Sequence, residues 1–122
     1  MALRMTDGSN RAAVIAAHND YFRRNLFFYP ARVGRVTMTR GVAELDAEVR
    51  LAVLRAVAAF DTFADDDPND PYHEHDFGRV DVGSVAVFWK IDYFENPAME
   101  QGAEDASKKA YRLLTIMLRE EY

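Results

Sequence analysis

The chain has 122 residues, of which 49% are hydrophobic and 29% charged, and its formal net charge is −5. This composition excludes intrinsic disorder, collagen and coiled-coil arrays, and the length predicts one globular domain over 1–122 with a flexible N-terminus at 1–8. The sequence has no cysteine and no apolar run near the ~18–20 residues of a membrane span, which excludes thiolate chemistry and predicts a cytoplasmic protein.

Hydrophobic spacing predicts two helices and a strand in the first half of the chain. Ser9 is expected to cap a helix that runs to about Leu26, where aromatic residues and a proline end it. Residues 33–39 alternate between apolar and polar side chains and predict a short strand. Residues 46–62 are predicted to form a helix because apolar side chains recur at spacings of three and four.

The second half of the chain begins with a predicted loop and a hairpin. Residues 64–72 contain two prolines and four aspartates, which suit neither a helix nor a strand. Residues 77–82 and 85–94 are predicted strands, and the two residues Gly83-Ser84 between them are typical of a tight hairpin turn.

The hairpin turn also predicts which side chains share a face. If Val82 lies opposite Val85, every other cross-strand pair follows, because partners in a hairpin have a constant index sum. The predicted core face consists of Val80, Val82, Val85, Val87, Trp89 and Ile91. The opposite face carries Phe77, Arg79, Asp81, Phe88, Lys90 and Asp92. Extending the ladder by two residues places His75 opposite Asp92.

The C-terminal part is predicted to contain a loop over 96–107 and a strand over 111–118. The pattern of 111–118 is also compatible with a helix, and the strand is favoured. Apolar residues on both of its faces indicate a strand inside the sheet. The predicted order is α-β-α-β-β-β, an α+β fold with two helices packed on an antiparallel sheet of about four strands.

Charge is distributed unevenly along the chain. Residues 1–60 carry nine arginines and five acidic residues, a balance of +4, whereas 61–122 carry six basic and fifteen acidic residues, a balance of −9. The segment 61–76 holds seven carboxylates and no Lys or Arg. Either the two regions face each other across the fold, or each binds a ligand of opposite charge.

The polar segment 69–78 suggests three kinds of site. A calcium loop is excluded, because Asp70 stands where the sharp turn of that loop needs glycine. A divalent metal site would draw on His73, His75, Asp76 and Asp92. No cofactor is expected, and the metal site is kept as an alternative.

The third kind of site is catalytic, with His75 and Asp92 as an imidazole–carboxylate pair. Asp92 would orient the ring as a general base, and Lys90 on the same face would stabilise an anion. No Ser, Thr or Cys nucleophile is placed beside this pair, so a structural role for it stays open.

Three segments carry a resemblance: NDPYHEHDFG at 69–78, FWKIDYF at 88–94 and LTIMLREEY at 114–122. Over roughly residues 12–122, the chain resembles a family of small bacterial domains of unknown function. The resemblance implies a setting on plasmids and other mobile elements, where small acidic proteins often oppose host defence. It implies family membership and no particular reaction.

The leading hypothesis is a non-catalytic binding protein that inhibits a host defence system through an acidic surface. The expected partner is a protein, and binding to a membrane or to nucleic acid is not expected. The sequence does not predict an oligomeric state. The predicted binding residues are Asp65, Asp66, Asp67, Asp70, Glu74 and Asp76. The alternative is a small metal-dependent or acid–base hydrolase centred on residues 74–76 and Asp92. A third hypothesis, nucleic acid or nucleotide binding by the arginines of 23–40, conflicts with the acidity of the chain.

Overall fold

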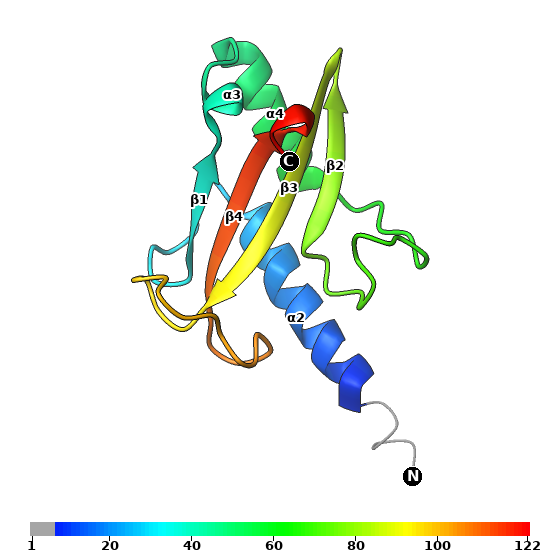
Figure 1. Cartoon of the computed structure of the whole chain (residues 1–122), viewed down its shortest axis with the longest axis vertical. Helices are drawn as coiled ribbons and strands as arrows, with labels where there is room; N and C mark the ends of the chain where they lie inside the picture. Colours follow the sequence, from blue (N-terminus) through cyan, green and yellow to red (C-terminus); the bar gives the residue numbers. More distant parts are fainter. Residues whose placement is uncertain (1–6) are drawn as a thin grey trace.

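A four-stranded sheet with the order β1-β4-β3-β2 organises the protein, and the computed structural model describes residues 7–122 (Figure 1). The strands are β1 (Gly34–Met38), β2 (Phe77–Val82), β3 (Val85–Phe94) and β4 (Tyr111–Leu118). The β2–β3 and β3–β4 pairs are antiparallel, whereas β1 runs parallel to β4. The α+β class is confirmed, but the sheet is mixed and not antiparallel throughout.

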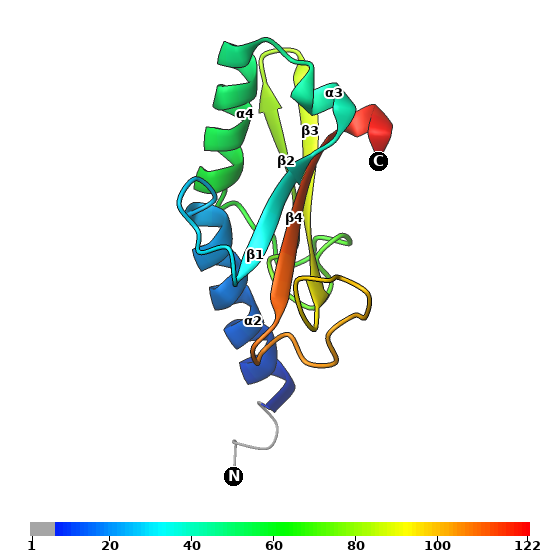
Figure 2. The same cartoon turned by 90° about the vertical axis from the view of Figure 1, so that its left-hand side faces the viewer.

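The helices are α2 (Asp7–Arg24), α3 (Arg40–Ala43), α4 (Ala47–Ala59) and the short 3₁₀ helix η1 (Arg119–Glu121). Figure 2 shows α2 and α4 on one side of the sheet and the 95–110 loop with η1 on the other. None of the helices within residues 7–122 has the length and apolar character that a membrane span needs.

The predicted helix boundaries need three corrections. Ser9 lies inside α2 and does not cap it, because the helix already includes Asp7. Residues 7 and 8 of the expected flexible N-terminus are helical, and its remainder lies outside the described residues. α2 and α4 each end two or three residues before their predicted C-termini, and the one-turn helix α3 was not predicted.

The hairpin is confirmed with the predicted register, in which Val82 lies opposite Val85 and Phe77 opposite Lys90. Residues 111–118 form a strand, and its place between β1 and β3 confirms that it lies inside the sheet. The core lies between the sheet and the helices, and its fully buried apolar residues are Val42, Val53, Val57, Val87, Trp89, Leu114 and Ile116.

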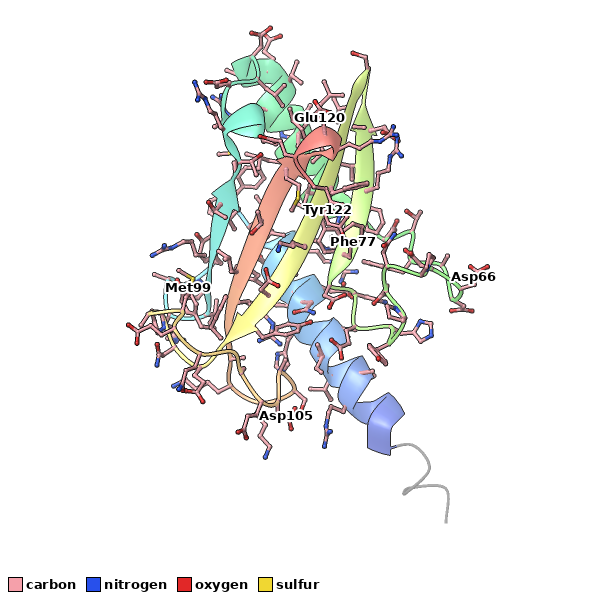
Figure 3. All side chains as sticks on the ribbon, viewed as in Figure 1. Asp66, Phe77, Met99, Asp105, Glu120 and Tyr122 are labelled. Atoms are coloured by element: carbon pink, nitrogen blue, oxygen red, sulfur yellow. The ribbon has the colours of Figure 1, made fainter. Side chains whose placement is uncertain are left out.

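The C-terminal residue covers part of the other face of the sheet. Tyr122 packs against Phe77 and Phe88, with ring centroids 5.4 and 5.1 Å away (Figure 3). This contact buries Phe77, which the hairpin parity places away from the main core.

Gly78 lies opposite Trp89 in the hairpin and leaves room for the indole ring. A Cβ atom at Gly78 would approach the Trp89 Nε1 atom to 2.5 Å. The indole is fully buried, so it has no space into which it can move. The absence of a side chain at Gly78 is therefore a packing requirement.

We expect Gly78→Ala to lower the free energy of unfolding by about 1–3 kcal/mol because it overpacks the core. Urea denaturation measures this change. Gly102→Ala is the matched control, since the nearest atom to its Cβ would lie at 3.8 Å; it should change stability by less than about 0.5 kcal/mol. Equal effects of the two substitutions would contradict the packing requirement.

Candidate functional site

An open cleft of about 870 Å³ lies between α2 and the loop that precedes β2. Helix α2 contributes Arg11, Asp20 and several alanines, and the loop contributes residues 72–75. The wall from the helix is mostly alanine with Arg11 and Asp20 among it, and every residue of the loop wall carries a titratable side chain. The loop belongs to the acidic segment of the sequence, so the cleft borders the acidic surface.

His75 pairs with Asp20 in this cleft. The His75 Nδ1 atom lies 3.1 Å from both carboxylate oxygens of Asp20. The predicted pairing with Asp92 is wrong, because the ladder ends at Phe77 and His75 has a left-handed backbone with φ of 58°. Asp92 instead contacts Lys90, with 3.3 Å between Oδ2 and Nζ. Neither Asp92 nor Lys90 lines the cleft.

Two further contacts fix the orientation of the His75 ring. Phe63 stacks on it with ring centroids 3.7 Å apart and planes only 2° from parallel. Asp20 is itself held by Arg23, whose Nη2 atom donates to Oδ1 at 2.9 Å. A carboxylate that accepts the Nδ1 proton leaves Nε2 as the basic nitrogen of the ring. The pair therefore has the Nδ1–carboxylate contact by which an acidic residue orients a histidine base.

Asp70 is buried within the loop and stabilises its conformation by hydrogen bonds to the backbone. Its side chain is 1% exposed, and its Oδ1 atom accepts the backbone N–H groups of Glu74 at 2.9 Å and His75 at 3.2 Å. These bonds support the left-handed conformations of His73 and His75. Although it was predicted to bind a partner, Asp70 presents almost no surface to one.

Asn19 joins the loop to α2 and to the sheet. Its fully buried amide donates to the Glu74 carbonyl oxygen at 2.9 Å and to the Tyr93 hydroxyl at 2.8 Å. Its Oδ1 atom accepts from Arg112 Nε at 2.7 Å. Burial raises the pKa of Tyr93, so the hydroxyl stays protonated and donates to Glu74 Oε1 at 3.3 Å.

Arg23 is buried and therefore belongs to no basic surface. Its guanidinium donates to the carbonyl oxygens of Val57 at 2.8 Å and Ala58 at 3.1 Å, at the end of α4. It also lies 5.0 Å from the ring centroid of Trp89. Burial lowers the pKa of Arg23, and the bond to Asp20 opposes this shift.

The remaining predicted binding residues differ in exposure. Asp65 and Asp66 are exposed at the outer end of the loop, where Figure 3 labels Asp66. Asp67 accepts the N–H group of Asn69 at 2.8 Å and is half-buried. Glu74 and Asp76 are half-buried and line a cavity of about 210 Å³ formed by loop residues 69–76.

The structure does not gather the predicted metal ligands. His73 and His75 both have left-handed backbones in a loop, and Asp92 contacts Lys90 on β3. Within residues 7–122, no three or more His, Asp or Glu side chains are grouped so that they could hold a metal ion.

Sequence reasoning missed Asn19, Asp20, Arg23 and Arg112. One signal for two of them was present, because Asn19 and Arg23 interrupt the apolar stripe of α2 beside Ile15 and Phe22. A polar side chain on a buried helix face requires hydrogen-bond partners, so such positions indicate a polar contact across the core.

Burial raises the pKa of the Asp76 carboxyl to about 6 from the ordinary 3.8, and the negative charges of Glu74 and Asp70 add to this shift. The stability that the proton contributes is present below pH 3.8 and is lost as the pH rises through about 6. Over this interval we expect the free energy of unfolding to fall on the order of 1–3 kcal/mol because of Asp76.

Urea denaturation of Asp76→Asn across this pH range measures the effect, since the amide cannot titrate. The variant should lose this part of the pH dependence, whereas Asp66→Asn, the same charge change at an exposed position, should retain it. A wild-type profile in Asp76→Asn would show that Asp76 is not the group that titrates.

The chain is similar in sequence to one known protein family. DUF3768, described as a protein of unknown function, matches residues 38–121. No curated protein and no solved structure matches the chain significantly. The matched range includes the acidic loop but not α2, which supplies Asn19, Asp20 and Arg23.

Proposed function

The chain belongs to DUF3768, a family of proteins of unknown function, and on that premise we propose that it is a non-catalytic binding protein. In this proposal the acidic loop, residues 61–76, docks on a basic surface of a bacterial protein. One observation carries the proposal: the loop presents exposed aspartates at its outer end while its base is fixed from inside.

The three aspartates at the outer end of the acidic loop have no ion-pair partner in the part of the chain that the structure describes. They are Asp65, Asp66 and Asp67, and 61–76 contains no Lys or Arg. Uncompensated negative charge on a projecting loop attracts a basic surface and speeds association with it.

The conformation of the acidic loop is set before any partner arrives. Asp70 accepts two backbone N–H groups, Asn19 donates to the Glu74 carbonyl oxygen, and His75 contacts Asp20. Binding then costs little loop ordering, and more of the contact energy contributes to affinity. These bonds also fit a loop with no catalytic role, because they occupy polar groups of the loop inside the protein.

The resemblance to domains of mobile elements suggests what the partner does. Proteins of such elements act inside the bacterial host, so the proposed interaction takes place in the cytoplasm. A component of a host defence system with a basic groove is the partner class that this setting favours.

The test neutralises the outer end of the loop. We expect the variant Asp65→Asn, Asp66→Asn, Asp67→Asn to capture its partner from a bacterial host lysate at least about tenfold less than the wild type, a loss of ~1.4 kcal/mol in binding. Affinity capture at physiological salt with quantitative mass spectrometry measures this loss. Asparagine keeps the oxygen that accepts the Asn69 N–H group.

The matched control removes the same charge elsewhere. Glu95, Glu100 and Glu104 are exposed on the loop before β4, and their replacement by glutamine should leave capture unchanged. The proposal fails if the wild type captures no partner, or if both triple variants lose it equally.

One observation favours a second function, an acid–base hydrolase. His75 and Asp20 line the cleft with the geometry of a general base, and Asp20 takes the role predicted for Asp92. None of the described residues that line this cleft is Ser, Thr or Cys, so water would be the nucleophile. His75 would take a proton from that water as its oxygen attacks the carbonyl carbon or the phosphorus of an aryl ester or phosphate. The bond to the aryl oxygen would break, the aryloxide would leave, and Arg11 would bind a substrate anion.

For this second function we expect His75→Asn to lower hydrolysis of aryl esters or aryl phosphates by about 10²–10⁴-fold, the contribution of a general base. Asparagine tolerates the left-handed backbone at this position. His73→Asn is the matched control, because His73 has φ of 59° and lines the same cleft. No turnover by the wild type, or equal loss in both variants, would exclude the hydrolase.

A further inference from the structure

A second pocket, of about 530 Å³, lies between α2, the segment before β1 and the start of β4. Five basic side chains line it: His18, Arg32, Lys108, Lys109 and Arg112. Among the described residues, no acidic side chain lines it, although the chain as a whole carries a net charge of −5. We call it the cationic pocket, and within residues 7–122 it shares no lining residue with the cleft beside the acidic loop.

The cations of this pocket are poorly neutralised by the protein. Within residues 7–122, neither Arg32 nor Lys109 forms an ion pair. Lys108 interacts with Asp105 electrostatically, but they form no ion pair, and Asp105 does not line the pocket. Like charges gathered without counter-charge repel one another, so an anion in the pocket would stabilise the arrangement.

Arg112 brings a buried charge to the wall of the pocket. Its side chain donates to Asn19 Oδ1 and to the Ala106 carbonyl oxygen, each at 2.7 Å, and neither acceptor is charged. Burial lowers the pKa of Arg112, because removing the guanidinium from water disfavours its charged form. A bound anion would supply the counter-charge that the surrounding side chains do not.

The pocket also offers an aromatic surface. Tyr21 lines it and is 68% exposed, and the apolar side chains of Phe22 and Val33 lie beside it. An exposed ring next to cations is the combination that binds nucleotides, since the base stacks on the ring and the cations contact the phosphates. Its volume falls within the ~300–1,000 Å³ of small-molecule sites.

We propose that the cationic pocket binds a nucleoside phosphate, with the base on Tyr21 and the phosphates among Arg32, Lys108 and Lys109. This activity is independent of the acidic loop and adds a ligand to the proposed function. The arginine-rich stretch 23–40 does not itself form the site. Arg23 is buried and Arg40 contacts Glu44, whereas Arg32 is joined by lysines from the far end of the chain.

The test titrates the full chain with ATP by calorimetry at low salt. We expect saturable binding, and the variant Arg32→Gln, Lys109→Gln should weaken it at least tenfold. The control is Arg35→Gln, Arg55→Gln, which removes two exposed arginines outside the pocket that form no ion pair in the described residues. It should change the Kd of ATP less than twofold.

Three further ligands separate the parts of the proposal. Adenosine and inorganic triphosphate should each bind at least tenfold more weakly than ATP, and Tyr21→Ala should remove the advantage of ATP over triphosphate. No ATP binding, or equal weakening in the two double variants, would overturn the proposal. If a single-stranded oligonucleotide bound and ATP did not, the pocket would be a nucleic-acid site, and the proposal that it binds a nucleoside phosphate would be overturned.

Discussion

The burial of Asn19 on the apolar face of α2 is the constraint on which the rest of the site depends. A buried primary amide has two donor hydrogens and an acceptor oxygen to satisfy, and leaving any of them unpaired costs free energy. The structure satisfies them with the Glu74 carbonyl oxygen, the Tyr93 hydroxyl and Arg112. These partners come from the loop, β3 and β4, so one side chain positions the helix, the sheet and the loop relative to one another.

Much of the fold was predictable because its signals are local. The Gly83-Ser84 turn and the alternation around it determine the hairpin register, and apolar residues on both faces of β4 indicate its interior position. The direction of β1 was not predictable, because the apolar pattern of a strand does not encode whether it pairs parallel or antiparallel with its neighbour. The partner of His75 was missed because a positive φ at histidine has no sequence signal and ends the ladder before Asp92.

Opposite charges lie on two sides of the same polar layer. The acidic loop and the His75–Asp20 pair border one flank of α2, and the cationic pocket borders another. Asn19 contacts both, through the Glu74 carbonyl oxygen on one side and Arg112 on the other. The two surfaces do not correspond to the two halves of the sequence, because Lys108, Lys109 and Arg112 of the cationic pocket come from the acidic half.

The parallel pairing of β1 with β4 has a consequence for where a folding unit can be cut. The family match begins at residue 38, the last residue of β1, so the matched sequence omits nearly all of this strand and the whole of α2. Without β1, the central strand β4 would become an edge whose free N–H and C=O groups lie between apolar side chains. Such an edge pairs readily with other chains, so β1 protects the protein against aggregation.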